Sequence, residues 1–106
     1  MPKLITIYWR DIPAQVMGRA RRDKHRVELS QRFQVAIDRA AMRAGRGSSD
    51  AYLEDWRRVT EMVTGDLAEQ VRQRAEELEA AFDDEHLERI VKAGGVRVDA
   101  QDTAGD

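Results

Sequence analysis

The chain has 106 residues and a formal net charge of −2, and 36% of its residues are charged against 42% that are hydrophobic. A chain of this length forms one domain, which buries roughly 65% of the surface that the unfolded chain exposes. It lacks cysteine, an apolar run of ~20 residues and a signal-peptide pattern, so we expect a cytoplasmic protein without disulfides, thiolate chemistry or membrane contact.

The first predicted element is a strand over residues 4–9. Its apolar side chains alternate onto both faces, which favours a central strand over an edge strand. We expect Asp11-Ile12-Pro13 to end it, because proline cannot donate to a strand ladder. A second strand is predicted over residues 14–21, and Gly18 within it indicates a bulge or a close backbone approach.

A third, short strand is predicted over residues 26–29, after a turn at residues 22–24. Its alternation directs Val27 and Leu29 inward. The second and third strands are therefore expected to form an antiparallel hairpin.

A helix is predicted to start at Ser30, whose hydroxyl can accept a hydrogen bond from a free N–H of the first turn. Its apolar positions have helical spacing: Phe33, Ile37, Ala40, Ala41 and Ala44. Gly45 and Gly47 are expected to end it, because glycine adopts the left-handed conformation that follows many helices.

The middle of the chain has a weaker pattern. Ser48 and Ser49 are suited to cap a short helix over residues 50–56. Residues 59–63 are predicted to form a fourth strand, although their pattern fits a helix nearly as well.

Two helices are predicted in the last part of the chain. Asp66 and Glu69 have the spacing of a capping box. The helix that they open carries a continuous apolar stripe: Leu67, Val71, Ala75, Leu78 and Phe82. Asp83 or Asp84 is expected to cap a last helix, which Gly94-Gly95 ends. The apolar face of that helix holds Leu87, Ile90 and Val91.

This order of elements predicts one α+β domain over residues 1–95. It would have a mostly antiparallel sheet of three or four strands, helices packed on one face, and a helical C-terminal half. Residues 96–106 are small, polar and acidic, which predicts a disordered tail.

The charges are divided unevenly along the chain. Residues 1–47 hold 11 basic and 4 acidic residues, a net charge of +7, whereas the remainder carries −9. Either the two halves attract each other within one fold, or the basic half binds a partner. The partner- or anion-binding candidates are Arg19, Arg21, Arg22, Lys24 and Arg26 in the hairpin, and Arg32, Arg39, Arg43 and Arg46 on or after the first helix.

Two dipeptides pair tryptophan with arginine: Trp9-Arg10 and Trp56-Arg57. Arginine stacks favourably on tryptophan, so these four residues can build an anion pocket. The alternative is that each tryptophan lies at the rim of the core and each arginine is solvated.

No residue pattern predicts catalysis, a metal site or a cofactor. Neither His25 nor His86 has a second ligand at metal spacing on its own element. The serines fit helix caps better than nucleophiles, and the paired carboxylates late in the chain lie on predicted solvated faces.

The run LITIYWRDIPAQV, the basic RARR, AIDRAAMRAG and YLEDWRRV resemble a bacterial virulence-factor domain family, over most of residues 3–95. Proteins that resemble it often occur beside genes for folate- and corrinoid-dependent methyl transfer. The resemblance implies an accessory role in one-carbon or methionine metabolism rather than in infection, and it implies no catalytic residues.

We therefore predict a non-catalytic accessory or interaction protein whose basic surface contacts an acidic protein partner or an anionic ligand. One alternative is a nucleic-acid-binding protein that uses the same surface, whose affinity would fall steeply with salt. Another is a small enzyme that acts on an anionic substrate at the Trp-Arg pairs.

Overall fold

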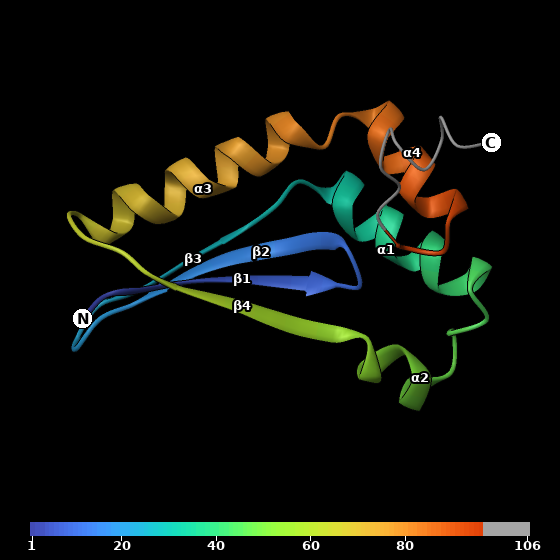
Figure 1. The fold of residues 1–106 in the computed structure, drawn as a ribbon, viewed down its shortest axis with the longest axis horizontal. Coiled ribbons are helices and arrows are strands. Elements are labelled where there is room, and N and C mark those ends of the chain that lie inside the picture. Colours follow the sequence, from blue (N-terminus) through green and yellow to red (C-terminus); the bar gives the residue numbers. More distant parts are fainter. Residues whose placement is uncertain (97–106) are drawn as a thin grey trace.

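The computed structural model describes residues 1–96, which form one four-stranded sheet and four helices (Figure 1). In chain order the elements are β1 (Lys3–Trp9), β2 (Ile12–Arg19), β3 (Lys24–Glu28), α1 (Gln31–Arg43), α2 (Ser49–Glu54), β4 (Trp56–Met62), α3 (Leu67–Ala81) and α4 (Asp84–Lys92). Apart from Val96, the predicted disordered tail lies outside the described residues.

The sheet is antiparallel throughout, with the strand order β3-β2-β1-β4. β1 is an inner strand, as its two apolar faces predict. Figure 1 shows α3 and α1 on the same side of the sheet, and both contact β2. The predicted α+β class, the helices on one face and the helical C-terminal half are confirmed.

The first strand ends at Trp9, before Asp11, as predicted, but the predicted start of the second strand at residue 14 was wrong, because β2 begins at Ile12 and includes Pro13. The chain reverses at Arg10, which has φ +53°. Pro13 lies opposite Tyr8, next to the point where the β1–β2 register shifts. The register skips Ala14, and prolines within sheets are found at bulges and strand starts, so Pro13 is tolerated beside the bulge and near the start of β2.

Gly18 marks a close approach between β2 and α3, as predicted. A Cβ atom at this position would lie 2.6 Å from Cγ2 of Val71 and 2.9 Å from Cδ1 of Leu67. The bulge between β1 and β2 lies at the start of β2, away from Gly18. The missing side chain therefore lets α3 pack directly on the sheet.

β3 is an edge strand, and this explains a partial error in its predicted burial. Leu29, just after the strand, is buried, but Val27 is 36% exposed. Val27 is next to Val16 on β2, and within residues 1–96 no strand lies on its other side. Alternation of polarity predicts the direction of a side chain but not whether a neighbour covers it.

The start of α1 differs from the prediction in one respect. Ser30 is the N-cap residue, but its side chain makes no cap hydrogen bond. Its hydroxyl instead donates to Oε1 of Glu79 at 2.8 Å, and its backbone N–H donates to Oε2 at 2.6 Å. Ser30 thus attaches the start of α1 to α3, a role that a local pattern does not predict.

The later caps follow the sequence more closely. Asp66 accepts from the backbone N–H of Glu69 at 3.3 Å, and Asp83 accepts from that of His86 at 2.8 Å. Between α1 and these caps, the predicted fourth strand is confirmed as β4. It begins at Trp56, so the short helix α2 ends earlier than predicted.

One core lies between the sheet and the helices. Its buried apolar side chains come from β1, β2, α1, α3 and α4, and include Trp9, Ile12, Val16, Phe33, Ile37, Val71 and Ile90.

Candidate functional site

The arginines of α1 are engaged with the acidic C-terminal helices. Arg39 makes a two-pronged ion pair with Glu88, with Nη–Oε distances of 2.7 and 3.0 Å. Arg32 donates to the backbone oxygen of Glu79 at 2.7 Å and to its carboxylate at 3.1 Å. Arg43 donates to the backbone oxygen of Lys92 at 2.9 Å. The positive charges of α1 are therefore used in ion pairs and hydrogen bonds within the fold.

A second cluster surrounds Asp55, at the junction between α2 and β4. Its Oδ2 atom accepts from Nε of Arg46 at 2.9 Å and from Nε of Arg10 at 3.2 Å. Arg10 also donates to the backbone oxygen of Gly94 at 2.8 Å. One carboxylate thus joins the β1–β2 turn to the loop after α1, and Arg10 extends the link to the end of α4.

The two Trp-Arg pairs lie opposite each other on β1 and β4, where Trp9 pairs with Trp56 and Arg57 donates to the backbone oxygen of Arg10 at 2.9 Å. Trp9 is fully buried, and its indole N–H donates to the backbone oxygen of Tyr52 at 2.9 Å. Arg57 lies over the ring of Tyr8, at 4.5 Å from its centroid, rather than over Trp56. The predicted stacking of arginine on tryptophan is thus found for Trp9 and Arg10, whose guanidinium carbon lies 5.3 Å from the ring centroid, while Trp56 and Arg57 together line a hollow on the sheet face.

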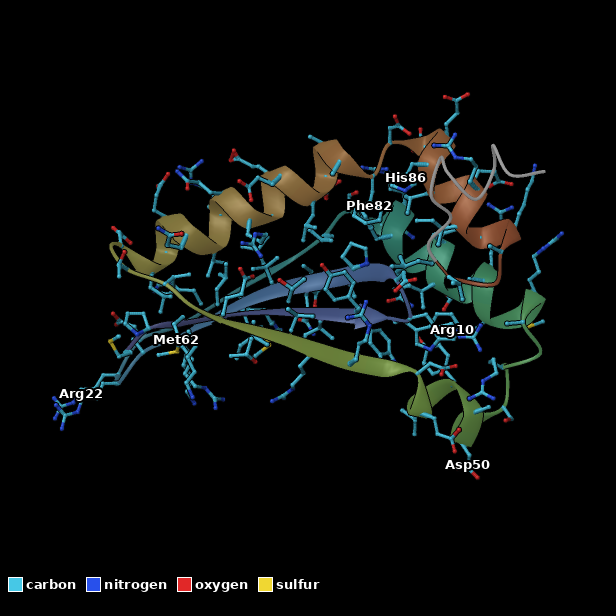
Figure 2. All side chains as sticks on the ribbon, in the orientation of Figure 1. Arg10, Arg22, Asp50, Met62, Phe82 and His86 are labelled. Carbon is cyan, nitrogen blue, oxygen red and sulfur yellow. The ribbon has the colours of Figure 1, made fainter. Side chains whose placement is uncertain are left out.

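The cations of the β2–β3 hairpin differ from those of α1 in how they are paired. The β2–β3 turn and its flanks carry four exposed cations, which we call the hairpin tip: Arg19, Arg21, Arg22 and Lys24. In residues 1–96, none of these four makes an ion pair, and the next cation, Arg26, approaches Glu28 only to 4.0 Å. Figure 2 shows Arg22 at one end of the molecule and Asp50 near the other. The hairpin tip is therefore a projecting surface with four cations and one acidic residue, Asp23, and none of its cations makes an ion pair in the described part of the chain.

The sheet face opposite α3 has a shallow hollow of about 630 Å³. Its lining combines apolar and basic side chains: Ile7, Gln15, Met17, Trp56, Arg57 and Arg58. Trp56 rests edge-on against Tyr52, with ring centroids 5.7 Å apart. The Oε1 atom of Gln15 is buried without a hydrogen-bond partner in the described part of the chain.

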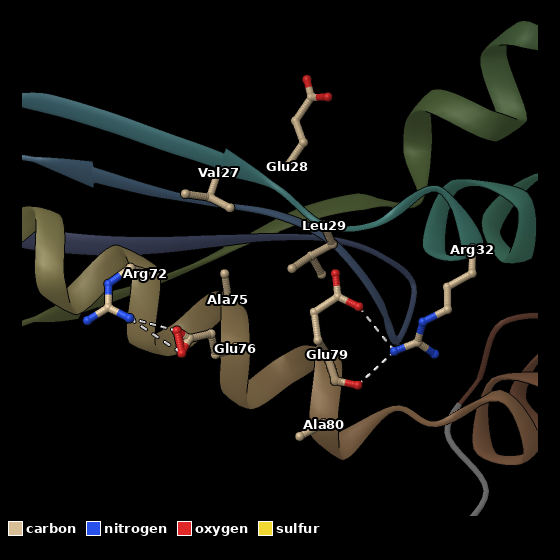
Figure 3. Close-up of a pocket in the computed structure, with 9 residues that line it drawn as sticks. All are labelled: Val27, Glu28, Leu29, Arg32, Arg72, Ala75, Glu76, Glu79 and Ala80. Atoms are coloured by element: carbon tan, nitrogen blue, oxygen red, sulfur yellow. Dashed lines mark hydrogen bonds and ion pairs between the residues drawn. The ribbon is translucent and has the colours of Figure 1, made fainter.

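A groove of about 530 Å³ lies between β3 and α3 (Figure 3). Sequence reasoning missed this groove and the Asp55 cluster. Val27 was assigned to the core, and nothing in a local pattern shows that an edge strand and a helix leave a space beside it. The Asp55 cluster joins residues up to 45 positions apart in the chain, so no spacing rule indicates it.

His86, near the start of α4, packs against the end of α3. The ring of His86 stacks on Phe82 with centroids 4.9 Å apart, and its Nδ1 atom lies 3.1 Å from the backbone oxygen of Ala81. Among the described residues there is no group of three histidine or acidic side chains that could hold a metal ion. No helix in that part of the chain is long and apolar enough to cross a membrane.

Ion pairing lowers the pKa of several carboxyl groups. Burial acts to raise the pKa of Asp55, but hydrogen bonds from Arg46 and Arg10 outweigh it, so the pKa is lowered. The pKa of Glu61 is lowered mainly by its hydrogen bonds from Arg74 on α3. These groups stay ionised to lower pH in the folded protein than in the unfolded chain.

Acidification is therefore expected to destabilise the fold. Below the ordinary carboxyl pKa of about 4, the unfolded chain binds more protons than the folded protein, so the stability contributed by these pairs is lost as pH falls through their folded pKa values. Thermal unfolding from about pH 7 to about pH 3 should show a falling midpoint below about pH 4.5, and the fall should be smaller in an Asp55→Asn variant. An equal fall in both proteins would show that Asp55 contributes nothing to it.

Comparison with known proteins gives one match. No curated protein and no solved structure matches the chain. The family model described as Virulence factor matches residues 7–91, which include the end of β1, all of β2, β3, α1, α2, β4 and α3, and most of α4. The match agrees with the resemblance predicted from the sequence, and the chain belongs to the virulence-factor family.

Proposed function

We propose that this protein is a non-catalytic interaction protein that contacts an acidic protein partner through the hairpin tip. The observation that carries the proposal is the uneven pairing of its cations. The arginines on and after α1 are bound to acidic side chains or backbone oxygens, whereas the four cations of the hairpin tip make no ion pair within residues 1–96.

Exposed like charges in one short hairpin repel one another, and an acidic surface relieves that repulsion on binding. Complementary charge on two surfaces also raises the rate at which the proteins associate, and it disfavours partners whose surface is basic. The α1 cations are less available to an acidic partner, because Arg32 and Arg39 are paired with internal carboxylates and Arg43 donates to a backbone oxygen. The hairpin tip therefore supports partner binding better than the rest of the predicted basic surface.

The pathway part of the proposal rests on the family resemblance. We propose that the partner is an enzyme of folate- or corrinoid-dependent methyl transfer, and that this protein supports that enzyme without transferring a group itself.

The alternative is nucleic-acid binding, which the open sheet face favours. Arg58 and Trp56 line its hollow, and guanidinium groups and aromatic rings can contact phosphates and bases. However, Arg19 pairs with Lys3 at one end of β1, whereas Trp56 pairs with Trp9 at the other. The stacking residue and the free cations thus lie at opposite ends of the sheet, so we place the protein partner first.

The test is affinity capture with a charge-reversed hairpin tip. Arg19→Glu, Arg21→Glu and Arg22→Glu are combined in one variant, and retained proteins are identified by mass spectrometry with and without nuclease. We expect the variant to retain at least about tenfold less partner than the unmodified protein, because three charges of the hairpin tip change from attracting the acidic partner to repelling it.

The matched control has the same change of net charge elsewhere: Arg43→Glu, Arg89→Glu and Lys92→Glu. It should retain the partner. Equal retention by the hairpin variant and the control would contradict the proposal. Captured material that absorbs near 260 nm and disappears with nuclease would replace it with the nucleic-acid alternative.

A further inference from the structure

β3 presents a free edge. It is the outermost strand on its side of the sheet. The backbone oxygen of Asp23 and the N–H of Leu29 bond inward, to Ala20 and Ala14 on the β2 side. Because backbone direction alternates along an antiparallel strand, the N–H and C=O groups of Lys24, Arg26 and Glu28 face outward. Such an edge is a template for pairing with another extended chain.

The groove of Figure 3 runs beside this edge. Its apolar lining comes from β3 and α3: Val27, Leu29, Ala75 and Ala80. Two ion pairs lie along the helix side, Arg72 with Glu76 at 2.8 Å and Arg32 with Glu79 at 3.1 Å. Since these charges compensate each other, the groove attracts apolar side chains rather than ions.

The two faces of β3 have different chemistry. Val27 pairs with the buried Val16 and lines the groove on the α3 side. Lys24, Arg26 and Glu28 alternate with it and therefore lie on the opposite face, where Arg26 pairs with Met17 and approaches Glu28 to 4.0 Å, which leaves two cations and one carboxylate there. An extended chain added to the edge would alternate in the same way. Its side chains would lie alternately over the apolar groove and beside the two cations.

We propose that the edge of β3 binds an extended segment of the partner in which apolar and acidic residues alternate. The segment adds a fifth strand to the sheet, a mode in which backbone hydrogen bonds give affinity and alternate side chains give specificity. The cations on β3 oppose pairing with a basic edge and select an acidic one. This inference rests on the proposed function and specifies how the acidic partner is recognised.

The test uses synthetic peptides about seven residues long, which is enough to span the five residues of β3. One alternates valine with glutamate, a second alternates valine with lysine, and a third has the composition of the first with its glutamates and valines in separate blocks. We expect the first to bind at least about tenfold more tightly than the other two, measured by fluorescence anisotropy.

Amide hydrogen exchange locates the binding. The N–H groups of Lys24, Arg26 and Glu28 should become protected when the alternating peptide is added. Ala80→Gln, which adds a larger side chain to the groove without changing the charge, should lower the affinity for the alternating peptide at least about tenfold. Ala68→Gln, the same change at an exposed position of α3 outside the groove, should leave its binding unchanged.

Equal affinity for the alternating and block peptides, or binding without protection of β3, would overturn the proposal. Protection of β3 in a self-associated protein without peptide would assign the edge to a second copy and would also overturn it. The proposed function can survive either result. It fails if charge reversal of the hairpin tip leaves the partner bound or if the captured partner is nucleic acid, whereas this inference fails if Ala80→Gln leaves peptide binding unchanged.

Discussion

Replacing Trp9 with alanine is expected to lower the free energy of unfolding by about 3–5 kcal/mol, the range for a large buried aromatic residue. The side chain of Trp9 is fully buried and stacks on Tyr52, with ring centroids 5.8 Å apart. Its ring also lies against Gly95, where a Cβ atom would come within 2.7 Å of it. The variant would leave a cavity where β1, α2 and the end of α4 meet, and equilibrium unfolding in urea measures the loss.

A Trp9→Phe variant separates packing from hydrogen bonding. It keeps an aromatic ring but removes the N–H that donates to Tyr52, whose oxygen still accepts from the backbone N–H of Asp55 at 3.4 Å, so it should cost about 0.5–1.5 kcal/mol, the net value of one hydrogen bond. If Trp9→Ala cost less than about 1 kcal/mol, the position of Trp9 at the centre of this junction would be wrong.

Gly18→Ala should destabilise the protein by about 1–3 kcal/mol, the usual effect of overpacking. The added methyl group would contact Val71, which is itself buried and cannot move freely. α3 would have to shift away from β2 to accommodate it. Urea unfolding gives the loss of stability, and near-ultraviolet circular dichroism reports any loosening of the aromatic core.

Gly47→Ala is the matched control, because a Cβ atom at Gly47 meets only the sulfur of Met42, at 3.4 Å. Its stability should stay within about 0.5 kcal/mol of the original protein. Equal effects of the two substitutions would contradict the direct contact between α3 and the sheet at Gly18.

Much of the fold was predictable because its signals are local. β1 shows two apolar faces, and α3 and α4 show apolar stripes that start at capping aspartates. Each of these patterns depends on residues within one element, and the order of the elements then favours an α+β arrangement. The family was predictable from longer strings of residues.

The deviations come from contacts between elements. Pro13 fits β2 near its start, beside a bulge with β1 at Ala14. Ser30 binds Glu79, on a helix 49 positions away, instead of capping its own. Val27 is exposed because no element covers the edge of β3 fully. In each case a partner distant in the sequence decides the outcome.

The candidate site, too, was predictable where its signal is local and not where it depends on contacts between elements. Composition along the chain reveals a basic half and an acidic half, but it does not tell which cations the acidic half pairs with. The structure pairs Arg39 and Arg46 with carboxylates in the second half of the chain and leaves the hairpin tip without an ion pair in the described region. This distinction selects one part of the predicted basic surface as the candidate interface.

The most direct test of the hairpin tip as the binding surface is site-specific photo-crosslinking in cells. A photoreactive amino acid at position 23, in the exposed turn, leaves all the neighbouring cations in place, and the same group at position 50 is the control near the other end of the molecule (Figure 2). We predict a nuclease-resistant crosslink to an acidic protein from position 23 and none to it from position 50. Crosslinking to that protein from position 50 alone, no protein product from position 23, or a product there that nuclease removes would contradict an acidic protein partner at the hairpin tip.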